Sequence, residues 1–421
     1  MADNKRFMIS NWCGIPKKFI RHADGSLAVD RLEEMKEAGI NLISTYDYGF
    51  ETNCEMLAAC HKLGLRVTLS DDRIDKAVHC ATTEERRELL SAVVRDYAGY
   101  PALHGYHIVD EPNSGAFPVL AEIREIFTEL DPVHESYYNL FPNYASLEML
   151  GNPTYYDHLA QFLTDVKPEI LSYDHYHFCK GEPMEQVELT DDREKQIYEA
   201  AFSKVERMGF FENIEDARNA CKEAKTPFMV IILVIEHGPY RNLTEAEIRW
   251  EVFQSVVYGS KRISYFTYWC PGVDRDEGEE FWHWKNAMIT KEGERTDHYY
   301  MVQKINKELQ LVGDILLDRE SLAVFHFGKE PDSKPVYWSG SFGDLTSLDA
   351  TKMTVGFFEG GMMLLANKDY DNAMPVTFTL AEGKAVQKLN KQSGIWEALA
   401  PVDGAYAITL AAGDGELLRI L

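Results

Sequence analysis

The sequence predicts an α/β protein, a (β/α)8 TIM barrel followed by a small C-terminal all-β sandwich. Short apolar runs alternate with amphipathic helical segments eight times between residue 7 and about residue 318. These runs are almost continuously apolar, as expected of parallel strands that helices cover on both faces. After about residue 320 the helical segments give way to short alternating strands separated by glycine turns. We therefore predict a barrel over 1–318 and a sandwich over 319–421.

The first strand candidate begins at residue 7 and the eighth ends at residue 269. Helical segments lie between them; residues 30–39, for example, place Leu32, Met35 and Ala38 on one face. Eight such units over about 300 residues match a (β/α)8 barrel in size and number. The eight strand candidates are residues 7–12, 40–46, 66–70, 103–109, 135–141, 169–176, 228–235 and 262–269.

Helix signals support the alternation between these strands. Capping boxes, in which a threonine and a glutamate close the start of a helix, are expected at 82–85 and 244–247. The long connection at 179–226 carries two helical patterns, 194–208 and 214–224. A doubly wound open sheet is the alternative, but no glycine-rich phosphate-binding motif follows the first strand.

Composition narrows the choice of partners. The 421 residues carry a formal net charge of −25, which argues against nucleic acid and against an anionic membrane surface. No signal peptide or 18-residue apolar run occurs, so we expect no membrane span. Seven scattered cysteines without a CxxC pair favour reduced thiols in a cytoplasmic protein. Whether the protein forms a homo-oligomer is left open by the sequence.

Two glutamates follow long apolar strands directly. Glu111 is the glutamate of HIVDEP, after the fourth strand, and Glu236 ends LVIE after the seventh. In (β/α)8 enzymes the active site lies at the carboxyl ends of the strands. We therefore take these two side chains as the candidate catalytic pair.

The motifs around both glutamates resemble those of the clan A retaining glycoside hydrolases. Asp110-Glu111-Pro112 is similar to the Asn-Glu-Pro of that clan, whose glutamate is the acid/base, and Glu236 falls where the clan keeps its nucleophile. The tail LAAGDGELLRIL resembles the small β-domain that ends the family 42 β-galactosidases. The resemblance implies a retaining β-glycosidase, exo-acting on small β-linked oligosaccharides, with no metal and no cofactor.

The reaction needs two carboxyl groups about 5–5.5 Å apart, one protonated and one ionised. Glu111 is expected to stay protonated because burial and neighbouring negative charge raise the pKa of a carboxyl group. Asp110 replaces the asparagine that, in the clan, donates to the sugar's 2-hydroxyl. An ionised aspartate can only accept, so the identity of the sugar stays open. Asp174 is the rival candidate for the nucleophile.

The other polar and aromatic side chains near the strand ends are assigned to sugar binding. Flat indole rings suit the apolar faces of sugars, and Trp269 is the preferred platform ahead of Trp282 and Trp284. The alternatives are a surface ion pair for Asp72 and Arg73, and turn capping for the asparagines. The complete set is Trp12, Asp47, Asp72, Arg73, Asp110, Asn139, Asn143, Asp174, His175, Tyr176, His177, His237 and Trp269.

Two other functions stay open at this stage. A metal-dependent barrel hydrolase would use Asp174, His175 and His177, with His104 or His107, but the first strand lacks the HxH pattern typical of such barrels. A barrel that binds carbohydrate without catalysis is the second alternative, because Asp110 departs from the clan's motif.

Overall fold

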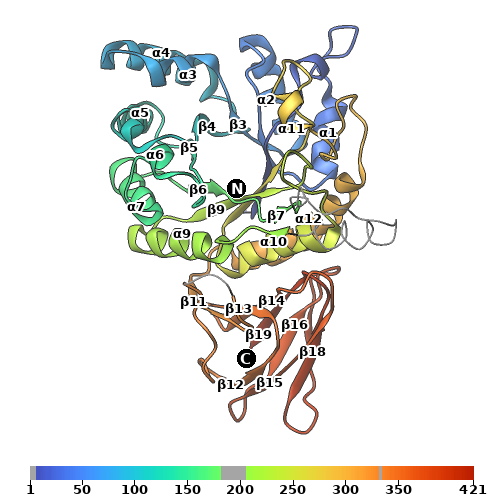
Figure 1. Cartoon of the computed structure of the whole chain (residues 1–421). Coiled ribbons are helices and arrows are strands. Elements are labelled where there is room, and N and C mark those ends of the chain that lie inside the picture. Colours follow the sequence, from blue (N-terminus) through green and yellow to red (C-terminus); the bar gives the residue numbers. More distant parts are fainter. Residues whose placement is uncertain (1–5, 182–204, 331–333) are drawn as a thin grey trace, which may run out of the picture.

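The computed structural model describes residues 6–181, 205–330 and 334–421, and its first part is a closed parallel barrel (Figure 1). The strands pair in the order β5-β4-β3-β2-β1-β10-β9-β6, and a parallel bridge between Leu140 and Tyr173 joins the two ends of this series. The eight barrel strands are β1 (Met8–Asn11), β2 (Leu42–Ser44), β3 (Arg66–Leu69), β4 (Leu103–Asp110), β5 (Glu135–Asn139), β6 (Leu171–Asp174), β9 (Phe228–Leu233) and β10 (Arg262–Phe266). All eight predicted strands are present, so the predicted barrel is confirmed.

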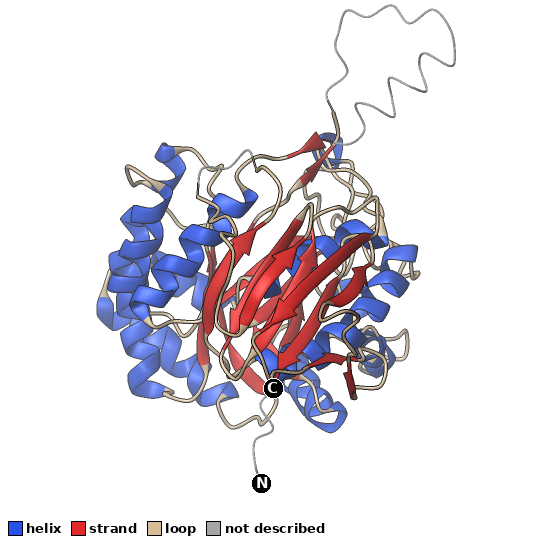
Figure 2. Cartoon of the chain, turned by 90° about the horizontal axis from the view of Figure 1, so that it is seen from below, coloured by secondary structure: helices blue, strands red, loops and turns tan. Residues whose placement is uncertain are grey.

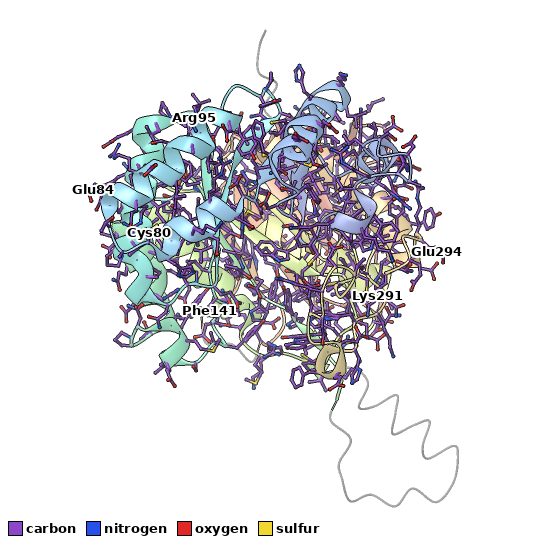
Figure 3. All side chains as sticks on the ribbon, turned by 90° about the horizontal axis from the view of Figure 1, so that it is seen from above. Cys80, Glu84, Arg95, Phe141, Lys291 and Glu294 are labelled. Atoms are coloured by element: carbon purple, nitrogen blue, oxygen red, sulfur yellow. The ribbon has the colours of Figure 1, made fainter. Side chains whose placement is uncertain are left out.

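Helices form a ring around the barrel strands (Figure 1). On the side away from the C-terminal sheets, Figure 3 labels Glu84 and Arg95, in the helix Thr83–Tyr97, and Cys80, in the turn before that helix. Two 3-10 turns, η1 (Lys17–Phe19) and η2 (Ser114–Ala116), lie in the loops. The helices are α1 (Val29–Glu37), α2 (Phe50–Leu63), α3 (Asp72–His79), α4 (Thr83–Tyr97), α5 (Phe117–Leu130), α6 (Leu147–Leu150), α7 (Tyr155–Asp165), α9 (Phe210–Ala224), α10 (Glu245–Val257), α11 (Glu279–Trp282) and α12 (Asp297–Leu316).

The two predicted capping boxes differ. At the start of α10, the Thr244 hydroxyl accepts from the Glu247 N–H, and the Glu247 carboxylate accepts from the Thr244 N–H. At the start of α4, Thr82 caps the Glu85 N–H, but the Glu85 carboxylate bonds to the Thr82 hydroxyl. The capping box predicted at 244–247 is therefore confirmed in full. At 82–85 only the threonine cap is confirmed.

The long connection between β6 and β9 contains a short antiparallel pair, β7 (Phe178–Cys179) and β8 (Val205–Glu206), followed by α9. The helix predicted over 214–224 is confirmed within α9. Of the helix predicted over 194–208, residues 194–204 lie outside the described residues, and the prediction is wrong for β8.

The C-terminal part is an all-β module, as predicted. Its antiparallel sheets have the orders β11-β13-β14-β19-β16-β17 and β12-β15-β18, and the strands are visible from below in Figure 2. A separate apolar cluster fills the space between them. The strands are β11 (Ser321–His326), β12 (Leu345–Asp349), β13 (Met353–Phe358), β14 (Met362–Asn367), β15 (Met374–Leu380), β16 (Val386–Leu389), β17 (Trp396–Ala398), β18 (Tyr406–Leu410) and β19 (Gly415–Ile420).

Helix α10 joins the two parts, because β13, β14 and β19 pack against it. Glycines allow this close approach: a Cβ on Gly356 would lie 2.2 Å from the Val257 carbonyl oxygen, and one on Gly415 would lie 2.4 Å from the Phe253 ring. The chain passes from α12 to β11 between residues 316 and 321. The predicted division at 318/319 falls in this short connection and stays a prediction.

All seven cysteines lie within the described residues and are free thiols. Burial raises the pKa of the Cys60 thiol to about 12, which keeps it protonated. None of the helices in the described parts of the chain combines the length and apolar composition that crossing a bilayer requires.

Candidate active site

The end of β4 places two adjacent carboxyl groups at the mouth of the barrel. Asp110 is the last residue of β4, and the Glu111 N–H donates to the Asn139 carbonyl oxygen at 2.8 Å. Glu111 has a φ of 47°, in the left-handed region that non-glycine residues rarely adopt. Backbone strain of this kind concentrates at functional sites.

Three carboxyl groups meet at this end of the barrel. The Asn139 side-chain amide donates to Asp110 Oδ1 at 3.0 Å and to Asp174 Oδ1 at 3.2 Å. The Glu111 carboxyl group is hydrogen-bonded to Asp174, the last residue of β6. The ends of β4, β5 and β6 are therefore linked through side chains.

The electrostatics of this cluster favour a protonated Glu111, as the sequence predicts. Burial raises the pKa of Glu111 well above its usual range, and the negative charges of Asp174 and Asp110 raise it further. Burial also raises the pKa of Asp174, with Asp110 adding to the effect. Asp110 itself is exposed to water, yet desolvation raises its pKa, a combination expected on a concave surface.

Glu236 lies three residues beyond β9 and is fixed through its backbone. It exchanges two 2.9 Å hydrogen bonds with Lys285, in the loop that follows β10. Its carboxylate pairs with Lys180 Nζ at 2.9 Å and accepts from the Asn286 amide at 3.0 Å. The side chain is 21% exposed, so a positive charge and an amide hold an accessible carboxylate in place.

Aromatic rings surround the segment that carries Glu236. The His237 ring lies 4.6 Å from Trp284 in a stacked arrangement. Tyr176 stacks on Phe266 at 5.3 Å, and both rings also contact His237. Burial lowers the pKa of His237 to about 4, which keeps the imidazole neutral at pH 7. His237 and Tyr176 thus belong to the surroundings of Glu236, as candidates for binding or support.

The two tryptophans at predicted strand ends have different surroundings. Trp12 is half-buried and makes edge contacts with His107 at 5.5 Å and Tyr137 at 6.2 Å, inside the barrel. Trp269 is 0% exposed and packs against Phe19 at 4.9 Å. Its indole therefore has no free face for a sugar, contrary to the expectation of a stacking platform.

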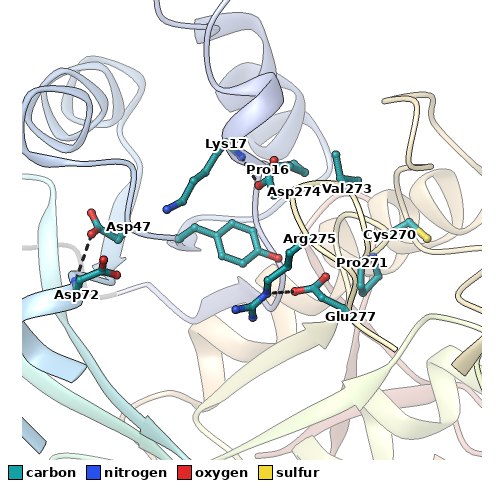
Figure 4. Close-up of a pocket in the computed structure, with 11 residues that line it drawn as sticks. Pro16, Lys17, Asp47, Asp72, Cys270, Pro271, Val273, Asp274, Arg275 and Glu277 are labelled. Carbon is teal, nitrogen blue, oxygen red and sulfur yellow. Dashed lines mark hydrogen bonds and ion pairs between the residues drawn. The ribbon is translucent and has the colours of Figure 1, made fainter. Parts of the chain in front are cut away.

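Asp47 and Asp72 line a cavity of about 300 Å³ formed by the loops after β1, β2, β3 and β10 (Figure 4). Asp47 Oδ2 accepts from the Asp72 N–H at 3.2 Å, and Tyr46 and Glu277 also line the space. Cys13 lies between this region and the carboxyl cluster. Its thiol is hydrogen-bonded to Tyr46, and the negative charge of Asp110 contributes to raising the pKa of that thiol.

The Arg73 guanidinium is bound by side chains of the protein itself. It bonds to Asp71 at 2.8 and 2.9 Å and to Asp96 at 2.6 Å, and it lies over the Tyr97 ring. These pairs fix α3 and α4, so the arginine that we expected to bind sugar serves the scaffold. The alternative of a pair between Asp72 and Arg73 is also not what the structure shows.

Three further candidates point into the protein. Asn143 donates to the Gly209 carbonyl oxygen at 2.9 Å and joins the loop after β5 to α9. His175 is fully buried, and burial lowers its pKa to about 3. His177 is 5% exposed and stacks on Trp250 at 4.4 Å.

In fold, the chain is similar to solved structures of glycoside hydrolases. No family model and no curated protein sequence matches this chain. It is similar in structure to a family 5 glycoside hydrolase from Bacteroides vulgatus ATCC 8482, with a TM-score of 0.58 and 10% identity over 99% of this chain and 89% of that one. A second glycoside hydrolase gives a TM-score of 0.56 and 11% identity over 100% of this chain and 96% of that one.

A β-galactosidase from the psychrophilic Marinomonas ef1 is similar over 74% of this chain, with a TM-score of 0.53 and 10% identity. The match covers 62% of the β-galactosidase, so this chain spans less than two thirds of that protein. At such identities the likeness concerns the barrel and its attached sheets, and the site has to be argued from the residues of this chain.

Sequence reasoning missed the partners of Glu236. Lys180 and Asn286 come from irregular segments after β6 and β10, where no strand pattern marks their positions. Phe266 was also missed, because β10 ends there and not at Trp269. No local signal marks this end, because the sequence stays rich in aromatic residues beyond Phe266, through Tyr268 and Trp269.

The histidines considered for a metal do not converge with Asp174. Within residues 6–181, 205–330 and 334–421, no group of three or more histidine, cysteine, aspartate or glutamate side chains is arranged to hold a metal ion. His175 instead bonds to Asn213 at 3.1 Å, and His177 Nε2 lies 3.6 Å from Glu206.

Proposed function

We propose that the chain is a retaining β-glycosidase that acts on the ends of small β-linked oligosaccharides, with Glu111 as acid/base and Glu236 as nucleophile. One observation carries this proposal: one end of the barrel presents a glutamic acid that favours its protonated form and a glutamate paired with Lys180. A double displacement at an acetal carbon requires a carboxyl group of each kind.

In the first step, the Glu236 carboxylate attacks the anomeric carbon while Glu111 transfers its proton to the departing glycosidic oxygen. The bond between carbon and leaving oxygen breaks as an ester between sugar and Glu236 forms. In the second step, the Glu111 carboxylate takes a proton from water, whose oxygen attacks the same carbon and releases Glu236. Lys180 and Asn286 orient the nucleophile and do not exchange protons in this scheme.

Asp174 is less suitable as the nucleophile. It is 5% exposed and hydrogen-bonded to Glu111, which leaves no space for a sugar carbon between the two carboxyl groups. A nucleophile and an acid/base act from about 5–5.5 Å apart, on opposite sides of the bond to be broken. The contact with Glu111 therefore argues against Asp174, and Glu236 stays the nucleophile that we propose.

Asp110 has one oxygen engaged by Asn139 and is exposed to water. We propose that its second oxygen accepts a hydrogen bond from a substituent next to the anomeric carbon of the sugar. A carboxylate cannot donate, so this contact selects a hydroxyl or an amine and disfavours a substituent that only accepts.

The test is hydrolysis of a panel of p-nitrophenyl glycosides of both anomers by Glu111→Gln, Glu236→Gln and a control, Glu84→Gln, on the outer face of α4. We expect turnover to fall by about 10²–10⁴ for Glu111→Gln and at least as much for Glu236→Gln. The control should keep full activity, and all three variants should unfold within a few degrees of the parent.

Azide separates the two roles. Glu236→Ala should regain activity with azide and give a glycosyl azide of inverted anomeric configuration, because the small anion attacks from the face that the glutamate leaves empty. Glu111→Ala should give an azide of retained configuration. Full activity of either glutamine variant would overturn the proposal, and sugar binding without any turnover by the parent protein would favour the carbohydrate-binding barrel.

A further inference from the structure

We propose that Asp174 is a positioning residue that accepts the acidic hydrogen of Glu111 in a hydrogen bond and keeps that proton on Glu111 until a leaving group takes it. This inference rests on the proposed function, because it gives Asp174 a part in the same reaction. It assigns to Asp174 neither nucleophilic attack nor contact with the sugar.

The hydrogen bonds around Asn139 fix the orientation of its side-chain amide. Asn139 Oδ1 accepts from the Ser172 hydroxyl at 2.9 Å, and Ser172 is itself bonded to the Tyr137 hydroxyl at 3.0 Å. The oxygen of the amide is thereby occupied on the barrel side. Its NH₂ group must point toward Asp110 and Asp174, and it can only donate to them.

The position of the shared proton follows from this orientation. Asp174 Oδ1 receives a hydrogen bond from Asn139 at 3.2 Å, which stabilises the ionised form of Asp174. Glu111 receives no such donor from the described side chains. In a hydrogen bond between two carboxyl groups one must carry the hydrogen, and this network assigns it to Glu111, with Asp174 as the acceptor.

The charges around the pair reinforce this assignment. Asp110 faces it from β4, and Cys13, after β1, faces Asp110 as a protonated thiol. The described parts of the chain provide no lysine or arginine ion pair to Asp110, Glu111 or Asp174. The remaining titratable groups that face Asp174 are tyrosines with raised pKa values, hence neutral: Tyr144, Tyr155, Tyr173, Tyr176 and Tyr240.

Arg207 is the cation that the described residues place beside these tyrosines. Its guanidinium lies 4.0 Å from the centre of the Tyr144 ring and bonds to the Tyr176 carbonyl oxygen at 3.3 Å and the Tyr240 hydroxyl at 3.2 Å. It is therefore engaged by neutral groups. Ionising Glu111 would place three carboxylates together without a cation between them, which is unfavourable at low local dielectric.

This arrangement acts in both steps of the proposed reaction. When Glu111 gives its proton to the leaving oxygen, the resulting carboxylate lies against Asp174 and Asp110. Their repulsion makes Glu111 a stronger base, so it takes a proton from the attacking water and returns to its resting state. The proton moves between Glu111, the leaving group and water, and Asp174 only accepts the hydrogen bond from Glu111.

The experiment is a titration of the Glu111 carboxyl carbon by ¹³C NMR in the unliganded full chain, assigned by its loss in Glu111→Gln. In Asp174→Asn, the pKa of Glu111 should fall by about one unit or more, a tenfold or larger loss of proton affinity. Asp110→Asn, which removes a charge but leaves the hydrogen bond intact, should give a smaller fall. Asp174→Ser provides the same measurement if the asparagine variant does not fold.

A kinetic arm separates this inference from the proposed function. In Asp174→Asn, the alkaline limb of the kcat/KM profile should move to lower pH by the same amount as the NMR titration. An unchanged Glu111 titration in an otherwise folded Asp174 variant would overturn the inference, even if activity fell. A shifted titration in a protein that hydrolyses no glycoside would leave the carboxyl pair standing and overturn the proposed function.

Discussion

Two clusters of charge in this chain, one at the junction of its two parts and one at the barrel mouth, are built on opposite principles. At the junction between α10, α12 and the C-terminal sheets, Arg249 bonds to Glu308 at 2.8 and 3.2 Å and to Asp414 at 3.2 Å. Lys391 adds a bond to Asp414 at 2.7 Å. Every carboxylate in this cluster has a cationic partner.

At the barrel mouth, Asp110, Glu111 and Asp174 meet around one asparagine amide, with no ion pair from the described residues. The consequences for protonation are opposite. Burial raises the pKa of Glu308, but bonds from Arg249 and Lys391 outweigh it and lower that pKa overall. For Glu111, burial and repulsion act in the same direction.

The difference separates a cluster that holds the fold together from one that is suited to chemistry. Compensated ion pairs at a junction keep two parts of the chain in a fixed arrangement. Carboxyl groups forced together without a cation hold a proton at a pH where free carboxylates do not, which is what a general acid needs.

Removing the cation from the junction should destabilise the protein strongly. Arg249→Met leaves Glu308 and Asp414 buried with too few partners, so we expect the free energy of unfolding to fall by about 3–5 kcal/mol in urea titrations. Asp174→Asn at the mouth should change it by less than about 1 kcal/mol, or increase it, because it relieves repulsion. Equal losses in both variants would remove the distinction between the two clusters.

A smaller loss is expected from crowding the junction. A Cβ on Gly356 would lie 2.2 Å from the Val257 carbonyl oxygen, so Gly356→Ala should cost about 1–3 kcal/mol through displacement of β13 from α10. Gly99 has no atom within 4 Å of such a Cβ, so Gly99→Ala is the matched control and should stay within about 0.5 kcal/mol. An unchanged free energy of unfolding in Gly356→Ala would show that β13 and α10 can move apart at little cost.

The two clusters should also respond differently to pH. Because the pKa of Glu111 is higher in the folded protein than in the unfolded chain, the folded state binds more protons, and this group's contribution to stability is lost as pH rises above about 4.5. Glu111→Gln should therefore become more stabilising, relative to the parent, between pH 5 and pH 8. Thermal unfolding at three pH values measures the difference.

Glu308 should behave in the opposite way. Its pKa is lower in the folded protein, so its contribution is present above the unfolded pKa and is lost as pH falls. Glu308→Gln should therefore be most destabilising near pH 7 and less so near pH 4. Parallel pH profiles for the two glutamine variants would contradict the assignment of the clusters.

The smallest effect is expected at a charge pair that belongs to neither cluster. Arg275 is 78% exposed and lies 3.2 Å from Glu277 at the rim of the cavity in Figure 4. Arg275→Ala should change the free energy of unfolding by less than about 0.5 kcal/mol, because solvent screens such pairs. A larger loss would mean that the rim of the cavity contributes to the fold.

The strands were predictable because a parallel barrel requires buried apolar runs at regular intervals, and local sequence records them directly. The position at which a strand ends is harder to predict from the local sequence. Trp269 was expected at the end of the eighth strand, but β10 ends at Phe266, and the chain then turns the indole into the core. A shift of three residues therefore moved the predicted platform away from the mouth.

Partnerships between side chains were predictable only where the chain places them close together. That Glu111 follows a carboxylate is visible in the sequence, but its bond to Asp174 depends on β4 and β6 flanking β5. Likewise, the use of Asn139 to link carboxylates, and of Lys180 to hold Glu236, results from tertiary contacts. Local patterns contain no information on them.

Helix α10 bears on how the molecule could be divided. Its residues from Glu247 to Val257 are all buried, because barrel strands cover one side and the C-terminal sheets cover the other. In a fragment that stops at the end of α12, Trp250 and Phe253 would become exposed as part of a long apolar surface. Such a surface favours self-association. An isolated barrel would therefore need polar substitutions along this face of α10 to remain monomeric.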